Sequence, residues 1–165
     1  MGGIYIQGPL PDTAIIVQTT AGTDIPNSQS HEYSLLELAQ FSDLRKSYPQ
    51  VHYLSEPSPI YNCHGLIFAS RRTAISQDAA VSTCLSEDGY TAVPREKVEP
   101  GDLALYYATN GDIEHSALVL SAPDPKLGIP QVLSKWGRFA EVAHWLHVCP
   151  YDSAHVRFFR LTKWT

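Results

Sequence analysis

The chain has 165 residues and a mass of 18.3 kDa, which fits a single domain spanning 1–165. It carries 12 lysines and arginines against 17 aspartates and glutamates, so its formal net charge is −5. This balance argues against nucleic acid as a partner, because phosphates need a basic surface, and against a polybasic membrane anchor. With 44% hydrophobic residues, the chain can bury a core.

The cysteines and the N-terminus bear on the compartment. Cys63, Cys84 and Cys149 are few, odd in number and far apart, unlike the cysteines of small disulfide-rich secreted proteins. The first residues lack the basic region and apolar stretch of a secretory signal, and no stretch approaches the ~18 apolar residues of a membrane span. We therefore expect a cytoplasmic protein, or one exported by a route independent of a signal peptide.

Residues 1–55 are predicted to form an N-terminal extension without an assigned role. The predicted elements are strands at 4–7 and 14–19, a helix at 32–40 and an irregular segment at 43–59. Leu35, Leu36 and Ala39 share one side of this helix. We expect the extension to cover one edge of the sheet or to shape a cleft.

Residues 56–165 are predicted to form the core. Asn62 can cap a helix that begins at Cys63, and residues at helical spacing run from Cys63 to Ala74. The other predicted elements are a helix at 77–85 and strands at 90–93, 103–107, 113–121, 131–136, 141–148 and 155–161. Asn110-Gly111 predicts a hairpin turn. Helices followed by an antiparallel meander indicate an α+β fold.

Cys63 is the candidate nucleophile. Free amide groups and the dipole at the start of a helix stabilise a thiolate, which is the reactive form for acyl transfer. The same amides could form part of an oxyanion hole. The alternative is a small buried cysteine that packs as a hydrophobic residue.

His115 is the candidate general base. It precedes the apolar run 117–120 and follows the predicted hairpin turn, so it can reach the end of a helix packed on the sheet. An imidazole with a pKa near 6.5 suits a general base or an ion-pair partner for a thiolate. The alternative is a histidine at a strand end that is exposed to water.

Three short motifs in this order resemble the NlpC-type and CHAP-type cysteine hydrolases. Segment 61–68, Tyr-Asn-Cys-His-Gly-Leu-Ile-Phe, resembles the nucleophile motif of these enzymes, with Asn62 in place of the usual aspartate and His64 in place of a small residue. Segment 100–106 resembles their proline-glycine-aspartate-leucine strand entry. Segment 113–119 resembles their histidine strand, with Ala117 in place of the usual glycine.

The resemblance implies a papain-like, NlpC-type core in which a nucleophile helix packs on an antiparallel sheet. It also implies a third polar residue on the strand after His115, where it would orient the imidazole. Ser134 is our choice, because its hydroxyl can accept a hydrogen bond from the ring, and His144 is the reserve. A charged Lys135 has no acceptor and could instead bind an anionic substrate or lie at the surface.

Substrate contacts are expected from residues next to these motifs. The candidates are Tyr61, His64, Lys135 and Trp136. Segment 141–149 contains His144, His147 and Cys149, but strand alternation turns His144 away from the other two, and no zinc-type cysteine spacing occurs. We therefore predict no metal site and no cofactor.

The sequence thus predicts a cysteine hydrolase that cleaves an amide bond through a Cys63–His115 dyad. The family's usual substrate is the peptide part of the bacterial cell wall, so we expect a peptide or peptidoglycan-like substrate and no nucleic-acid or membrane partner. An intracellular peptidase, deamidase or acyltransferase of the same fold is one alternative. A non-catalytic interaction module, in which Cys63 is merely buried, is the other.

Overall fold

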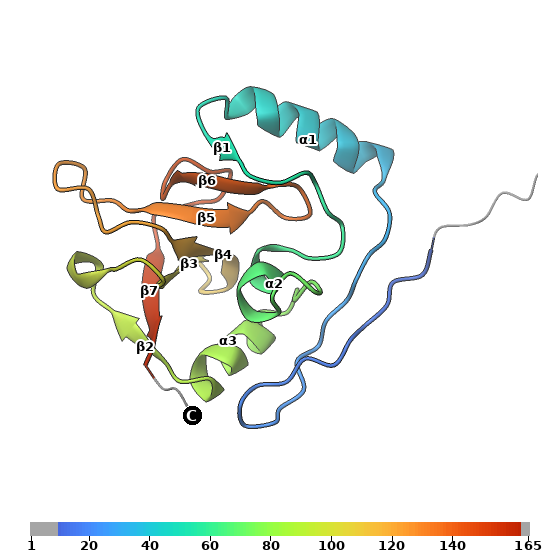
Figure 1. Ribbon diagram of the computed structural model, residues 1–165, viewed down its shortest axis with the longest axis horizontal. Helices are drawn as coiled ribbons and strands as arrows, with labels where there is room; N and C mark the ends of the chain where they lie inside the picture. Colours follow the sequence, from blue (N-terminus) through green and yellow to red (C-terminus); the bar gives the residue numbers. More distant parts are fainter. Residues whose placement is uncertain (1–9, 163–165) are drawn as a thin grey trace, which may run out of the picture.

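The computed structural model describes residues 10–162, which form a seven-stranded sheet flanked by helices (Figure 1). The helices are α1 (Leu35–Ser47), α2 (Cys63–Phe68) and α3 (Asp78–Glu87), with a short 3-10 turn at Arg95–Lys97. The strands are β1 (His52–Tyr53), β2 (Tyr90–Val93), β3 (Leu103–Tyr107), β4 (Ile113–Val119), β5 (Gln131–Lys135), β6 (Glu141–Trp145) and β7 (Val156–Leu161). The predicted α+β class is confirmed, and no helix between residues 10 and 162 is long and apolar enough to cross a membrane.

The sheet is antiparallel throughout, in the order β1-β6-β5-β4-β3-β7-β2. Strands β3 to β6 form the predicted meander, while β7 returns to pair with β3 and carries β2 at its outer edge. The predicted turn at Asn110-Gly111 is confirmed: Gly111 has a φ of 94°, which a residue without a Cβ adopts readily. A bulge in the β3–β4 pairing lies at Tyr106/Tyr107, beside His115.

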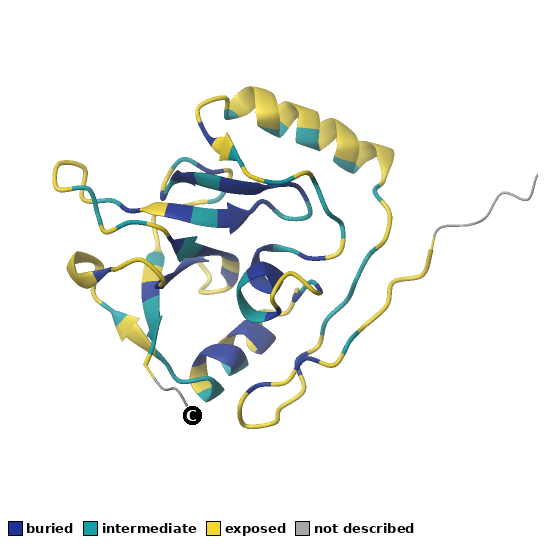
Figure 2. Ribbon diagram, in the orientation of Figure 1, coloured by how far each residue is buried: buried dark blue, intermediate teal, exposed yellow. Residues whose placement is uncertain are grey.

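Two hydrophobic clusters lie on opposite faces of this sheet, because successive strand residues point to opposite sides. On β3, Ala104 and Tyr106 belong to the first cluster, and Leu103 and Leu105 belong to the second. Side chains of α1 pack against the first cluster, and those of α3 contribute to the second. Figure 2 shows buried residues on α2 and α3, whereas α1 is largely exposed.

The N-terminal extension differs from its prediction. Segment 14–19 forms no strand; its backbone pairs only at isolated positions, as where Gln18 pairs with Asp24. Helix α1 begins later than predicted, because Ser34 and Glu37 form a capping box at its start. Leu35 and Leu36 are consequently 86% and 68% exposed, and the helix packs through later residues such as Phe41. The predicted strand at 4–7 lies outside the described residues.

Helix α2 is shorter than the spacing from Cys63 to Ala74 predicted. It ends at Phe68, and Ser70 and Arg71 then have φ values of 50° and 65°, in the left-handed region that stops a helix. The chain turns back so closely that a Cβ on Gly65 would lie 1.8 Å from the carbonyl oxygen of Thr73. Gly65 therefore allows a tight reversal of the chain against α2.

Candidate active site

Cys63 is the first residue of α2, as predicted, and Asn62 is its cap. The Asn62 Oδ1 atom accepts from the backbone N–H of Gly65 at 2.9 Å and of Ile75 at 3.1 Å, while its Nδ2 donates to the Ile75 carbonyl at 2.8 Å. One side chain thus fixes the start of the helix and the segment that follows its reversal. The thiol that this frame positions is only 5% exposed.

His115 lies on β4 opposite Tyr106 and is fully buried. The ring of Tyr151 stacks on its imidazole with centroids 3.7 Å apart and planes 9° apart, and the Tyr106 ring meets it edge-on at 5.1 Å. Neither ring nitrogen of His115 has a hydrogen-bond partner in the described part of the chain. Aromatic packing, rather than directed hydrogen bonds, therefore holds this ring.

A second imidazole, that of His64, also faces the Cys63 sulfur. The Nδ1 atom of His64 lies 2.9 Å from the Oγ atom of Ser116, the residue after His115 on β4. Because His115 and Ser116 are neighbours on a strand, they point to opposite faces of the sheet. His115 and Ser116, the partner of His64, therefore belong to different faces of β4.

The histidines set the charge state of the thiol. Burial alone would raise the pKa of Cys63, but the charges of His64 and His115 lower it well below its ordinary value. Helix α2 has only six residues, so its dipole is small and the imidazoles are the main source of stabilisation. Burial raises the pKa of Cys84 to about 11 and also raises that of Cys149.

Ser134, the predicted third residue, forms no hydrogen bond with the ring of His115. Its Oγ atom instead lies 2.8 Å from the Nε2 atom of His144, and the Nδ1 atom of His144 lies 2.8 Å from the Trp145 carbonyl oxygen. Since a carbonyl only accepts, Nδ1 carries a proton. Burial lowers the pKa of His144 to about 4, so Nε2 is unprotonated at neutral pH and accepts from the Ser134 hydroxyl.

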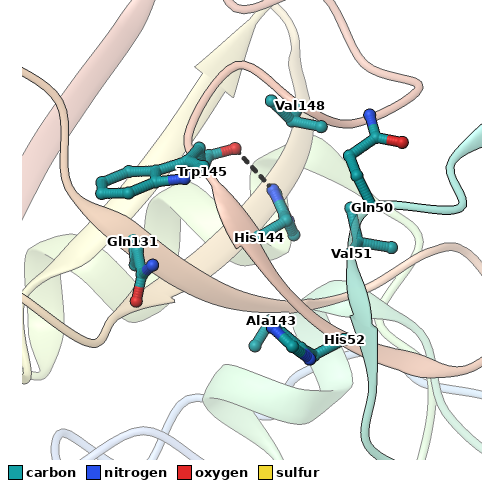
Figure 3. A pocket seen from close by; sticks show the side chains of 8 residues that line it. All are labelled: Gln50, Val51, His52, Gln131, Ala143, His144, Trp145 and Val148. Carbon is teal, nitrogen blue, oxygen red and sulfur yellow. Dashed lines mark hydrogen bonds between the residues drawn. The ribbon is translucent and has the colours of Figure 1, made fainter. Parts of the chain in front are cut away.

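The far side of His144 borders a cavity of about 80 Å³ between β1 and β6 (Figure 3). It is lined by Gln50, Val51, His52, Gln131, Ala143, His144, Trp145 and Val148. Neither Cys63 nor His115 lines this cavity, so it is not the entrance to the candidate active site.

Three of the predicted substrate-binding residues are buried in other contacts. The Tyr61 hydroxyl donates to Glu141 Oε1 at 2.7 Å, and Arg71 bonds to the same carboxylate from the protein surface. Lys135 is neither at the surface nor free to meet an anion: it is fully buried, donates to the Phe139 carbonyl and lies 4.5 Å from the centre of the Tyr61 ring. Burial lowers the pKa of Lys135 to about 8.

Trp136 packs in the first hydrophobic cluster rather than on a cleft wall. It is 2% exposed, and its indole meets the ring of Tyr48 at 5.0 Å. Asp102, from the second motif, is also structural: it caps a turn through the Glu99 N–H and pairs with Arg160 at 2.7 Å. Asp102 therefore braces β3 against β7 and contributes no group to the site.

Residues 10–162 contain no cluster of three histidine, cysteine or acidic side chains that could hold a metal ion. The chain turns after Trp145, so His147 and Cys149 lie beyond the end of β6 rather than on it. Sequence reasoning placed His64 among the substrate contacts and missed its approach to the sulfur. The signal was the two neighbouring pairs Cys63-His64 and His115-Ser116, of which His64 and Ser116 hydrogen-bond across from α2 to β4.

Comparison of the chain with protein-family models, with curated proteins and with solved structures finds no match. The chemistry of the site therefore rests on its own geometry. That geometry is a buried cysteine at the start of a helix, with two imidazoles near its sulfur and a tyrosine ring stacked on one of them.

Proposed function

We propose that this protein is a cysteine hydrolase of papain-like, NlpC-type architecture that cleaves an amide bond in a peptide or peptidoglycan-like substrate. One observation carries the proposal: Cys63 is the thiol whose pKa is lowered, and it lies at the start of a helix with His115 beside it. A thiolate paired with an imidazole is the arrangement that acyl transfer needs.

The proposed reaction has two stages. His115 takes the thiol proton, the Cys63 sulfur attacks the amide carbonyl carbon, and the carbon–nitrogen bond breaks. The leaving amine takes the proton from His115, and the acyl group stays on sulfur as a thioester. Water then attacks the thioester, gives its proton to His115 and releases the acid, which regenerates the thiolate.

Tyr151 controls access in this proposal. It comes from the segment between β6 and β7 and keeps part of its surface exposed, while the His115 ring beneath it has none. Substrate can reach the sulfur and the ring only if Tyr151 moves aside. We therefore assign the described conformation to the closed state of the enzyme.

The same burial favours a second candidate function. With Cys63 5% exposed and His115 fully buried, the pair could serve packing alone, in a non-catalytic interaction module built on this scaffold. The two candidates differ in whether the thiol reacts with electrophiles at neutral pH.

Brief treatment with iodoacetamide at pH 7, followed by mass spectrometry, separates the candidates. A hydrolase is expected to label at Cys63 before Cys84 and Cys149, because only Cys63 is ionised. Incubation with bacterial cell-wall peptides should then release amines, and Cys63→Ala and His115→Ala should each abolish that release. Preferential labelling of Cys149, or cleavage that survives Cys63→Ala, would overturn the proposal.

A further inference from the structure

His64 is held more firmly than His115, although both face the same sulfur. Its Nδ1 atom bonds to the Ser116 hydroxyl at 2.9 Å, whereas the His115 ring nitrogens have no such partner among residues 10–162. His64 is 6% exposed and Ser116 is fully buried, so water competes little for this hydrogen bond. The hydrogen bond thus fixes the orientation of the His64 ring next to Cys63 at the start of α2.

The surroundings of His64 favour a positive charge. Asp78, at the start of α3, faces the ring, and its own carboxylate is fixed by the backbone N–H of Ile113 at 2.7 Å. The Cys63 thiolate, on the same helix as His64, also faces the ring. Burial alone would lower the pKa of His64, but the thiolate and Asp78 raise it above its ordinary value.

The sheet adds two further titratable groups near the sulfur. His115 of β4 lies on the other face of that strand, and the buried Lys135 of β5 also faces Cys63. The nearer partners of the His64 ring from β4 are neutral: the Ser116 hydroxyl and the Ile113 carbonyl. Both can accept from a doubly protonated imidazole.

We propose that His64 is a fixed cation beside the Cys63 sulfur, held in position by Ser116, that stabilises the thiolate without exchanging protons with substrate. The proposal rests on the proposed function only in taking Cys63 as the nucleophile. His115 keeps the task of proton transfer that the proposed function gives it. Ser116 is then a positioning residue that acts through His64.

The two histidines should respond differently to removal. Loss of the fixed charge in His64→Gln is expected to raise the thiol pKa, because an opposite charge at this range shifts a pKa by about one unit or more. Loss of the ring in His115→Gln is expected to abolish turnover with a smaller change in the thiol pKa. Ser116→Ala is expected to move the thiol pKa in the same direction as His64→Gln, by less.

The pH dependence of Cys63 alkylation by iodoacetamide, followed by mass spectrometry, measures these shifts. In His64→Gln the midpoint should rise by about one pH unit or more, which corresponds to roughly tenfold slower labelling at a pH below both midpoints. A midpoint that stays at the wild-type value in this variant, or that moves more in His115→Gln, would overturn the proposal.

Imidazole nitrogen NMR of the unaltered protein tests the charge without any substitution. His64 should carry protons on both ring nitrogens at pH 7, while His144 in the same spectrum should show the neutral form protonated at Nδ1. A neutral His64 at pH 7 would overturn the proposal even if the variants fail to fold. If no amide is cleaved but His64 is charged and its loss raises the thiol pKa, the hydrolase function fails and the fixed cation stands.

Discussion

Two buried histidines each contact a serine of the sheet, and the surroundings of the two rings favour opposite charge states. Ser116 bonds to His64 at 2.9 Å and Ser134 bonds to His144 at 2.8 Å, so the serine contact is nearly the same. Yet the pKa of His64 is raised and that of His144 is lowered to about 4. The serine therefore does not decide whether a buried imidazole is charged.

The difference comes from what else faces each ring. His64 meets a thiolate and the carboxylate of Asp78, which favour the imidazolium. At His144, burial has the largest effect on the pKa, which it lowers. His115 and His147 also lower this pKa, because they oppose a further positive charge. A buried histidine becomes part of a reactive site only where an anion accompanies it.

The largest expected effect comes from separating α2 from the segment that packs against it. Gly65→Val places a side chain where a Cβ alone would lie 1.8 Å from the Thr73 oxygen and 3.2 Å from the Tyr61 Cβ. We expect a loss of about 3 kcal/mol or more in the free energy of unfolding, measured by urea denaturation. Cys63→Ala in the same helix should stay within about 1 kcal/mol. A tolerated valine together with an unfolded Cys63→Ala would make Cys63 a core residue.

The pH dependence of the free energy of unfolding should report that His144 is neutral in the folded protein. The unfolded histidine binds its proton near pH 6.5 and the folded one only near pH 4, so the unfolded state binds more protons in between. The contribution of the neutral His144 to the free energy of unfolding should therefore be fully present above pH 6.5 and should fall by on the order of 3 kcal/mol as the pH drops to 4. His144→Gln should flatten this part of the stability curve, and the exposed His147→Gln should not. An unchanged slope in His144→Gln would contradict the neutral assignment.

Removing the ring over His115 should open the site. Tyr151→Ala deletes a half-buried aromatic side chain, at an expected cost of about 2 kcal/mol in the free energy of unfolding. Iodoacetamide should nevertheless label Cys63 in the folded variant faster than in the wild type, because the ring no longer covers the pair. Tyr151→Phe retains the aromatic ring that stacks on His115 and serves as the control. Equal labelling rates in Tyr151→Ala and wild type would remove Tyr151 as the gate.

The smallest effect is expected at Ser134, the serine that contacts the neutral His144. Ser134→Ala leaves the buried Nε2 atom of His144 without its donor, which should cost about 1 kcal/mol. It should leave the pH dependence of Cys63 alkylation unchanged, in contrast to Ser116→Ala. A shift of the thiol pKa in Ser134→Ala would show that the two pairs are coupled.

The sequence was sufficient for most of the sheet and for the position of Cys63 at the start of α2. Strands such as Leu103–Tyr107 are short apolar runs bounded by turn residues, and Asn62 and Asn110-Gly111 are local signals that need no tertiary context. The early end of α2 was not predictable from periodicity, because Ser70 and Arg71 adopt left-handed backbone conformations that residues other than glycine rarely take.

The site could be predicted only in part, for a geometric reason. Strand alternation places Ser134 on an inner face but does not say which buried histidine it meets, and here it meets His144 rather than His115. Lys135 was expected to bind an anion or lie at the surface, because charged residues are seldom buried, yet the Phe139 carbonyl and the Tyr61 ring hold it inside. The approach of His64 to Ser116 depends on how α2 docks on β4, which no local pattern encodes.

Ultraviolet titration of the thiolate near 240 nm, in the wild type and in Cys63→Ser, tests the central claim most directly. The account predicts that the wild type shows one thiolate step well below the ordinary pKa of a thiol, and that this step is missing in Cys63→Ser. Cys84 and Cys149 should titrate only at alkaline pH in both proteins. A wild-type curve without a step below pH 8, identical to that of Cys63→Ser over this range, would contradict the account.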